Sequence, residues 1–365
     1  MSAIRPLERR DLPQVADLYE YVMGSGSRTP RPGLGACLGR LLLDHPWADP
    51  DIPSLVYETS EGRIVGFLGS HVRRLRVDGK PIRAGVTGQF MSDPAMRGVG
   101  ALLLRRYFAG PQDVTLTDSA KPEIRPIWEG LGGTTASLGS LTWIRVFRPF
   151  QLGSDLLLAS HRRMKRLARP LCAAFDRAAA RVGGRLLGVD EPATVARELT
   201  PQAVLEHLPT VTRRARVRPD YDEAFLTWIF QEMGRPDGEG DLVRHLVCDQ
   251  SGRVLGWYVA YLRAGGTGEV QQIAAACRDV EAVVEHLFYQ AQRSGAAALR
   301  GQLVPLVAEP VWRRRCLLLT TSRFLVHARD PSLLHAIAGG DGLLSRMDCE
   351  WWMRHPIASL QTSRG

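Results

Sequence analysis

The order of predicted secondary structure repeats once along this 365-residue chain. In each half, an alternating apolar pattern typical of a strand is followed by apolar residues at helical spacing. Further strands joined by hairpin turns, a helix and a short strand then complete each copy. Residue identities barely repeat between the halves, and the chain exceeds the usual size of one compact domain. We therefore expect an α+β (mixed α/β) protein with two copies of one fold.

The first copy has its clearest signals in residues 54–91, which are predicted to form three strands. Glu61-Gly62 and Asp78-Gly79 separate these strands, and both pairs favour tight hairpin turns. The remaining predicted elements are a strand at 2–11, a helix at 11–23, a weaker helix at 32–46, a helix from Gly98, a strand at 113–119, a short helix at 122–132 and a strand at 141–149.

A basic stretch at 153–184 follows, which we interpret as two amphipathic helices divided by Pro170. Its end at Gly183-Gly184 is typical of a helix C-cap and a hinge. The second copy then comprises strands at 193–200, 268–276, 297–304 and 349–354, helices at 201–214, 221–233 and 279–295, and a hairpin at 241–262. The predicted boundaries are a first domain at 1–150, a basic helical linker at 151–186 and a second domain at 187–365.

Composition excludes several classes of protein. Apolar residues make up 45% and charged residues 23%, which excludes wholesale disorder. No segment approaches the ~20 apolar residues that a membrane-spanning helix needs. The N-terminus is charged where a signal peptide would be apolar, so we expect a cytoplasmic protein. The cysteines are far apart, which argues against a structural zinc site, and we expect no metal. They are Cys37, Cys172, Cys248, Cys277, Cys316 and Cys349.

Positive charge is concentrated locally. The net charge is +9, and basic residues cluster at 161–170, at 177–185 and at 212–218. These clusters either solvate helix faces or attract an anionic surface, and the second reading predicts weak contact with such a surface through 161–185. No aromatic-interleaved RNA-binding signature accompanies them, so we expect no nucleic-acid partner.

The stretch MSDPAMRGVGALLLRR at 91–106 is the strongest candidate for a binding site. A predicted strand ends there and passes through Gly98 and Gly100 into a helix. The first N–H groups of a helix lack intrahelical partners and attract anions, and glycines let a phosphate approach the backbone. The stretch is neither a Walker loop nor a dinucleotide GxGxxG motif, because no GK[ST] follows and the third position is Leu103. A purely structural turn is the alternative.

The order of elements around this loop resembles that of the GCN5-related N-acetyltransferase (GNAT) family, which binds acetyl-CoA. The signature of that family is [QR]-x-x-G-x-[GA], and its counterpart here is Ala95-Met96-Arg97-Gly98-Val99-Gly100. The first position is therefore Ala95, unless Arg97 supplies the charge. A second family stretch, aromatic–x–x–Leu–Gly–aromatic, resembles residues 128–133, with Gly133 at the last position. The resemblance covers roughly residues 3–148.

The resemblance implies a fold and a set of binding residues. It implies two tandem GNAT-like domains, each a twisted, mostly antiparallel sheet flanked by helices. Acetyl-CoA or a longer acyl-CoA would be the co-substrate, with its pyrophosphate on Arg97, Gly98, Val99, Gly100 and Ala101. The two central strands would part near a bulge, and pantetheine would pair with the backbone of Phe90 and Ser92, one N–H of which would polarise the thioester carbonyl. Ser119 would lie nearby and could hold a water molecule.

Acyl transfer to an amine also needs a base. Asp118 follows the apolar strand and is the first candidate, with a helix N-cap as its alternative role. Glu58 is the second candidate, with an exposed strand face as its alternative. Glu123 favours a helix N-terminus, and Asp93 a turn. Relatives often use a Tyr as acid on the short helix, where this chain has Trp128; no Tyr lies between residues 107 and 221.

The second copy lacks a glycine loop, since QQIAAACRDVEAVV at 271–284 passes from strand to helix without one. We interpret it as a degenerate copy that has lost CoA binding. The leading hypothesis is an N-acyltransferase that acts on a primary amine of a small acceptor, such as an amino sugar or an amino acid derivative. The alternatives are a non-catalytic CoA-binding or scaffold protein and a peripheral membrane protein that docks through 161–185.

Overall fold

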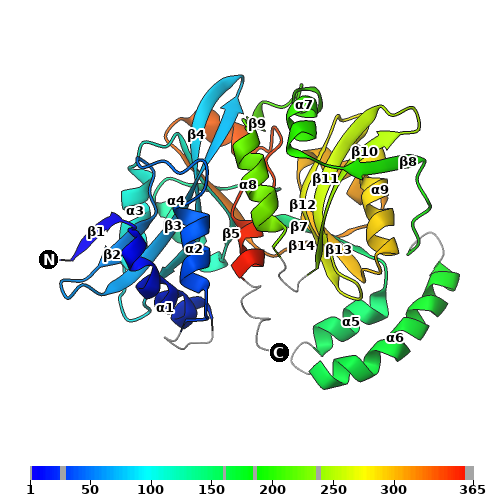
Figure 1. Cartoon of the computed structure of the whole chain (residues 1–365), viewed down its shortest axis with the longest axis horizontal. Coiled ribbons are helices and arrows are strands. Elements are labelled where there is room, and N and C mark those ends of the chain that lie inside the picture. The colour runs from blue at the N-terminus through cyan, green and yellow to red at the C-terminus, as the bar shows by residue number, and fades with distance from the viewer. Residues whose placement is uncertain (1, 25–29, 159–161, 184–186, 236–239, 358–365) are drawn as a thin grey trace. The chain divides into compact units, whose positions relative to one another are not determined.

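We describe the protein from a computed structural model, which covers residues 2–24, 30–158, 162–183, 187–235 and 240–357. The chain forms two compact units, each with its own sheet (Figure 1). The first unit comprises Met1–Ser140, Ala215–Gly238 and Ser322–Gly365, and the second comprises Leu141–Arg214 and Glu239–Thr321. Both sheets are mostly antiparallel and flanked by helices, as the sequence predicts.

The sheet of the first unit has eight strands in the order β1-β2-β3-β4-β5-β15-β6, with β9 paired to β3. Only β4 and β5 are parallel neighbours in it. The strands are β1 (Ala3–Pro6), β2 (Leu55–Glu58), β3 (Ile64–Val77), β4 (Lys80–Ser92), β5 (Val114–Ala120), β6 (Thr134–Thr135), β9 (Val217–Pro219) and β15 (Arg323–Ala328). The hairpin between β3 and β4 turns at Asp78 and Gly79, whose φ values are 50° and 80°, so the predicted turn is confirmed.

Helices of the first unit pack on this sheet through apolar side chains. Leu103 and Leu104 of α3 lie in one buried cluster with Leu68 and Val72 of β3. This packing fixes the start of α3 next to the end of β4. The helices are α1 (Leu12–Met23), α2 (Leu34–Leu42), α3 (Val99–Phe108), α4 (Arg125–Gly130), α8 (Glu223–Met233) and α11 (Pro331–Ala338).

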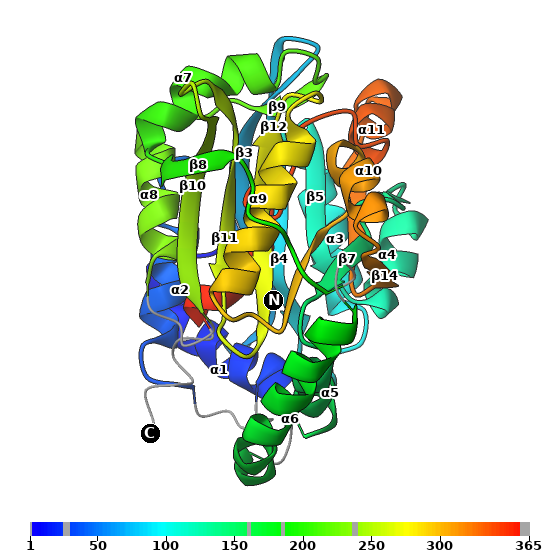
Figure 2. The ribbon, with the colours of Figure 1, turned by 90° about the vertical axis from the view of Figure 1, so that its right-hand side faces the viewer.

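The second unit repeats this arrangement around a seven-stranded sheet in the order β14-β7-β13-β12-β11-β10-β8. Again one neighbouring pair, β12 and β13, is parallel. Helix α9 lies across β11 and β12 (Figure 2). The strands are β7 (Leu141–Val146), β8 (Thr194–Glu198), β10 (Asp241–Asp249), β11 (Val254–Leu262), β12 (Thr267–Ala275), β13 (Ala298–Gln302) and β14 (Leu317–Thr320). The helices are α5 (Pro149–Leu157), α6 (Arg162–Gly183), α7 (Pro201–Val211), α9 (Val280–Arg293) and α10 (Pro305–Arg313).

The units exchange one strand each, which the predicted boundaries at 150 and 187 do not anticipate. Strand β7 follows the first-unit segment along the chain but pairs with β13 and β14. Strand β15 comes near the end of the chain and pairs with β5 and β6. Both strands occupy the same position in their sheets, because β15 lies beside β5 and β7 beside β13, each the second strand of its parallel pair. The compact units are therefore interleaved along the sequence.

Two further local predictions differ from the structure. The segment predicted as the closing strand of the second copy belongs to the first unit and contains a short 3-10 helix at Trp351–Met353, because strand β7 occupies the place beside β13 in the second sheet. The basic stretch is divided between α5 and α6, before Arg162, and α6 continues through Pro170. Both helices belong to the second unit, so 151–186 is not a separate body. The hinge predicted at Gly183-Gly184 lies partly outside the described residues.

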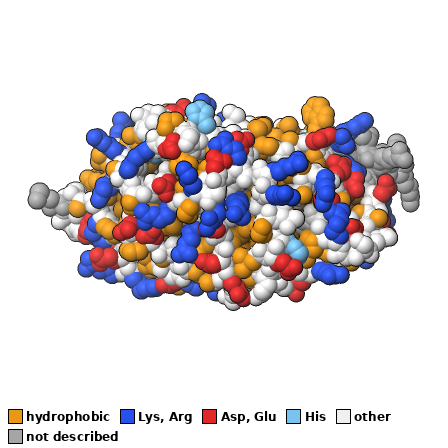
Figure 3. All heavy atoms as spheres, turned by 90° about the horizontal axis from the view of Figure 1, so that it is seen from above, with side chains coloured by type: hydrophobic (Ala, Val, Ile, Leu, Met, Phe, Trp, Pro, Cys, Tyr) orange, Lys and Arg blue, Asp and Glu red, His pale blue; other side chains and the backbone are white. Residues whose placement is uncertain are grey.

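Surface charge does not form one continuous field on the face shown in Figure 3, where basic, acidic and apolar side chains are interspersed. Among the described residues, no helix combines the length and apolar character needed to cross a bilayer.

Candidate functional site

The N-terminus of α3 is open and has no side-chain cap. Gly98 is its N-cap residue, with a left-handed φ of 84°. Arg97 and Gly98 are exposed, and a Cβ on Gly98 would meet nothing within 4 Å. The first turn of α3 contains no acidic residue. The geometry therefore leaves the first N–H groups of α3 oriented toward an exposed loop, as an anion site requires.

Gly100 is a second constrained position in this loop. A Cβ there would lie 3.0 Å from the ring of Phe90 on β4, so glycine lets the helix start pack directly against that strand. Val99 is buried beneath the loop, and Ala101 is half-buried in the first turn. Asp93 accepts a hydrogen bond from the Ala95 N–H at 3.0 Å, which agrees with its predicted role in the turn.

Strand β4 contains a bulge immediately before the loop. Gln89 and Phe90 stand opposite Leu68 alone, because the register of β3 and β4 shifts there. Gln89 has a φ of 48°, which is unusual for a residue other than glycine. Its buried Oε1 atom has no hydrogen-bond partner among the described residues. Bulges of this kind redirect a strand and are common beside functional sites.

The bulge coincides with the parting of β4 and β5. These strands pair only at Ala84–Val86 and Val114–Leu116. Beyond that, the Asp93 N–H donates to Val65 O at 2.8 Å on β3. Because neighbouring residues of a strand direct their backbone groups to opposite edges, those of Phe90 and Ser92 point away from β3. The two predicted pantetheine-binding residues thus share a free strand edge next to the α3 loop.

A carboxyl pair lies on the β5 side of this opening. Glu350, from the C-terminal segment, accepts hydrogen bonds from the backbone of Asp118 and from both the backbone and hydroxyl of Ser119, at 2.8–3.2 Å. The Thr117 hydroxyl also donates to it. Its Cβ lies 3.1 Å from where a Cβ of Gly88 would be, so Glu350 reaches from β5 to β4.

Asp118 is the other member of the pair and is 3% exposed. Its Oδ1 accepts from the Trp351 N–H at 3.1 Å and the Glu350 N–H at 3.3 Å. Its buried Oδ2 has no partner among the described residues. Burial, and then the negative charge of Glu350, raise the pKa of Asp118 well above its ordinary value. The protonated form of Asp118 is therefore favoured more than that of a solvent-exposed aspartate.

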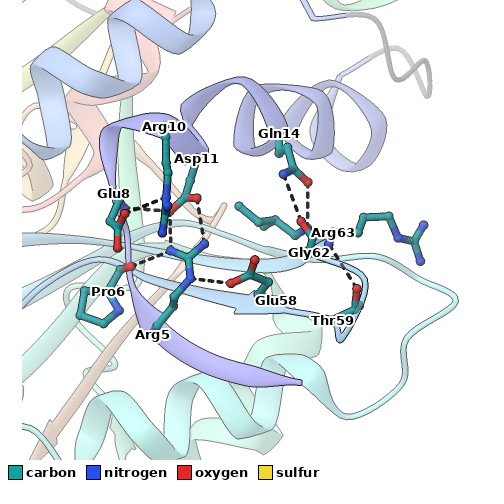
Figure 4. A network of polar contacts seen from close by, with 11 residues as sticks. Arg5, Pro6, Glu8, Arg10, Asp11, Gln14, Glu58, Thr59, Gly62 and Arg63 are labelled. Carbon is teal, nitrogen blue, oxygen red and sulfur yellow. Dashed lines mark hydrogen bonds and ion pairs between the residues drawn. The ribbon is translucent and has the colours of Figure 1, made fainter. Parts of the chain in front are cut away.

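Glu58 lies elsewhere in the sheet (Figure 4). Its Oε2 accepts from Arg5 Nε at 2.6 Å, and the same guanidinium binds both carboxylate oxygens of Asp11. Strands β3 and β4 lie between β2 and β5. Three spacings of ~4.8 Å between neighbouring strands therefore separate Glu58 from Asp118, which is roughly 14 Å across the sheet. The structure does not bring the two predicted bases together.

Tyr107, the tyrosine of α3, does not provide an acid at the opening. Tyr107 is buried under β3, where its hydroxyl shares a hydrogen bond of 2.5 Å with Ser70. Burial raises the pKa of Tyr107 beyond its ordinary value. Trp128 of α4 is a core residue that contacts Phe108 edge-on. Glu123 is exposed in the turn before α4.

Sequence reasoning missed Glu350, and it assigned no residue to the bulge that the resemblance implied. The signal for Glu350 was an acidic residue between Cys349 and Trp351, in a stretch expected to be a closing strand. Its partners are more than 230 residues away along the chain, so no local pattern could identify them. Gln89 stood out only as a polar residue in an apolar strand.

Comparison with solved structures identifies the fold. A GCN5-related N-acetyltransferase from Anabaena variabilis superimposes with a TM-score of 0.57 and 9% identity, over 91% of this chain and 74% of that one. One from Kribbella flavida gives 0.55 and 15%, over 91% and 72%. Saccharomyces cerevisiae N-myristoyltransferase with bound myristoyl-CoA gives 0.54 and 10%, over 90% and 79%. No family model and no curated protein matches the sequence.

The chain therefore has the GCN5-related N-acetyltransferase fold, as its resemblance to that family implied. The likeness extends over about nine-tenths of the chain and so includes both units.

Proposed function

We propose that the protein is an acyl-CoA-dependent N-acyltransferase whose CoA site lies in the first unit. The observation that carries this proposal is the combination of an uncapped helix N-terminus at Gly98 with a free strand edge at Phe90 and Ser92. An anionic pyrophosphate and an extended chain of amides are the two chemical features that such a pair of surfaces complements.

In this proposal the backbone N–H groups of Gly98, Val99, Gly100 and Ala101 bind the pyrophosphate, and Arg97 adds positive charge at the exposed loop. The backbone of Phe90 and Ser92 pairs with pantetheine, and one of these N–H groups polarises the thioester carbonyl. Ser119 contributes by holding Glu350 through its hydroxyl, at 2.8 Å. No bound metal takes part in the proposed chemistry.

The carboxyl pair supplies the acid and base. The acceptor amine attacks the thioester carbon, so that a C–N bond forms and the C–S bond breaks. The Glu350 carboxylate takes the proton that the ammonium group releases. Asp118, whose raised pKa favours its protonated form, can protonate the departing thiolate, and the second proton that the nitrogen loses as the amide forms restores Asp118. Glu58 is the weaker candidate for the base, since its carboxylate already pairs with Arg5.

The acceptor is a primary amine of a small molecule, such as an amino sugar or an amino acid derivative, and the acyl group is acetyl or longer. This assignment rests on the fold alone, because acceptor pockets vary freely between proteins that share it. The second unit is a degenerate copy that no longer binds CoA. A cytoplasmic location and a tandem origin by duplication complete the proposal.

The deciding experiment is calorimetric binding of acetyl-CoA to the wild type and to a Gly98→Val, Gly100→Val double variant. We expect binding by the wild type and none by the variant. Gly79→Val is the matched control, because Gly79 has nearly the same φ as Gly98 and an equally open Cβ position, but lies in a hairpin turn. Binding that persists in the double variant would contradict the assignment of the pyrophosphate site to the N-terminus of α3.

A second candidate is a CoA-binding protein without catalytic activity. It is favoured by the burial of Asp118 and by the use of Trp128 where relatives often have a tyrosine. Turnover separates the two candidates: release of free CoA thiol in the presence of an amine library supports the enzyme. CoA binding with no thiol release from any acceptor supports the scaffold.

A further inference from the structure

The hairpin of helices α5 and α6 carries an unusual concentration of exposed apolar side chains. Fourteen large apolar side chains are exposed among the described residues, and six of them lie on these two helices. They are Phe150, Leu157, Met164, Leu167, Leu171 and Phe175, with exposed fractions from 47% to 83%. We call these six residues the apolar stripe.

The stripe is continuous along one face. Met164, Leu167, Leu171 and Phe175 follow one another at intervals of three or four residues, so they share one side of α6. Phe150 of α5 extends that side, since its ring centroid lies 5.4 Å from that of Phe175. Helices α5 and α6 run side by side in both ribbon views (Figures 1 and 2).

A specific contact fixes this hairpin. The buried carboxylate of Asp176 on α6 accepts hydrogen bonds from the backbone N–H groups of Phe150 and Gln151, at 2.9 and 3.0 Å. These groups are the free donors at the start of α5. The apolar stripe is therefore presented by a defined pair of helices, and Asp176, the only acidic residue of α6, is occupied internally.

The charge of α6 identifies what the stripe binds. The helix contains Arg162, Arg163, Lys165, Arg166, Arg169, Arg177 and Arg181, so its net charge is 7 − 1 = +6. Arg177 is exposed and lies about 200° around the helix from Phe175. An exposed apolar stripe on a helix whose sequence is rich in arginine is the combination that holds a helix in the plane of an anionic bilayer surface.

We propose that the α5–α6 hairpin docks the protein on membranes that contain anionic lipid, with the apolar stripe inserted among the acyl chains. A helix of a partner protein would also cover apolar residues, but it offers no reason for six net positive charges on so short a segment. The proposal concerns the second unit and is independent of acyl transfer in the first.

The test is co-sedimentation of the full-length protein with vesicles of phosphatidylcholine alone or with added phosphatidylglycerol. We expect binding only to the anionic vesicles, and weaker binding at high salt. Leu167→Glu with Leu171→Glu should reduce the bound fraction roughly tenfold or more, since each leucine loses its apolar transfer energy.

The matched control is Leu317→Glu with Leu319→Glu, which changes two similarly exposed leucines of β14 outside the hairpin. This control should bind vesicles like the wild type. Circular dichroism checks that each variant is folded. Failure of the wild type to bind anionic vesicles, or equal loss in both variants, would overturn the proposal. So would lipid-free self-association of the wild type that the Leu167 and Leu171 substitutions abolish.

Discussion

Helices α3 and α9 follow corresponding strands of the two sheets, but only the N-terminus of α9 carries acidic side chains. Gly98 begins α3 with a left-handed backbone, and no carboxylate lies in the first turn. Asp279 begins α9 with a φ of −107°, and Glu281 follows it in the first turn. The Arg253 guanidinium binds Asp279 at 3.1–3.2 Å. One helix start is therefore open to an anion, whereas the other already contains its own.

The strands beside these helices also differ in the partners of the buried polar side chains compared below. Between β12 and β13 the buried Glu269 carboxylate pairs with Arg300 at 2.8 Å, and between β11 and β12 the Trp257 Nε1–H donates to Gln272 Oε1 at 2.8 Å. Between β4 and β5, Asp118 and Gln89 each keep a buried oxygen without a partner among the described residues. Since unpartnered buried polar atoms are costly, these two oxygens are candidates for contact with a ligand at the opening of the first unit.

The largest effect we expect is on turnover by Glu350→Gln. This change keeps the size of the side chain and removes the base, so kcat should fall by about 10²-fold or more while acetyl-CoA affinity changes little. Glu269→Gln, which changes the buried carboxylate of β12 in the second unit, should leave kcat unchanged. Steady-state kinetics of both variants measures the difference. Equal losses of activity in the two variants would remove the functional distinction between the units.

A pH-dependent effect on stability is expected for Asp118→Asn. The folded state raises the pKa of Asp118 above 3.8, so at higher pH the unfolded chain has released a proton that the folded chain retains. This carboxyl therefore destabilises the fold increasingly as pH rises above its ordinary pKa. Asparagine has no proton to release, so the variant should gain stability relative to the wild type as pH rises above 3.8. Urea unfolding at about pH 4 and at about pH 7 tests the sign.

Each unit also contains a pair of neighbouring histidines, and the two pairs differ in their hydrogen bonds. In the first unit, buried His71 stacks on His45 at 5.2 Å, and neither ring nitrogen of His71 has a partner among the described residues. In the second unit, Tyr258 joins His245 and His286 through hydrogen bonds of 2.8 and 3.0 Å. Burial lowers the pKa of His45 to about 3 and that of His286 to about 4.

Because both pKa values are lowered, stability is complete above the ordinary pKa of 6.5 and is lost as pH falls toward the folded values. His71→Leu should make the thermal midpoint less sensitive to acid, since it removes one buried imidazole from the first unit. The exposed His335 provides the control, and His335→Leu should leave the acid sensitivity unchanged. Identical pH profiles for the two variants would show that acid does not act through this pair.

The smallest effect is expected for Asp279→Asn. Its partner Arg253 is 48% exposed, so solvent screens the pair and the loss of unfolding free energy should be ~1 kcal/mol or less. Acetyl-CoA binding should not appear in the second unit, because Glu281 still occupies the first turn of α9. Chemical denaturation and calorimetry check the two statements. A new CoA site in this variant would show that Asp279 alone blocks it.

Local signals in the sequence predicted local structure. Asp78-Gly79 forms its hairpin turn with both residues at positive φ, and Gly98 adopts the left-handed conformation expected between strand and helix. The repeated order of elements predicted two sheets of the same plan. Each of these features is determined by a few neighbouring residues, which is why single-sequence patterns are sufficient.

Long-range pairing could not be predicted in the same way. Strands β7 and β15 are both short apolar strands, and nothing in either specifies the sheet to which it adds. The contact between Glu350 and Asp118 depends on that exchange, because it requires the C-terminal segment to return to the first unit. A local pattern gave the wrong structure for 349–354 for the same reason.

The strand exchange has a consequence for biosynthesis. A ribosome releases residues 1–140 long before β15, so the first sheet waits for its missing strand while more than 180 further residues are made. During this interval β5 has an unpaired edge, the kind of surface through which nascent chains aggregate or swap segments. Neither half of the gene, cut near codon 150, encodes a complete sheet. Chaperone dependence during synthesis, and failure of separately expressed halves unless they are produced together, are the expected costs of this interlaced design.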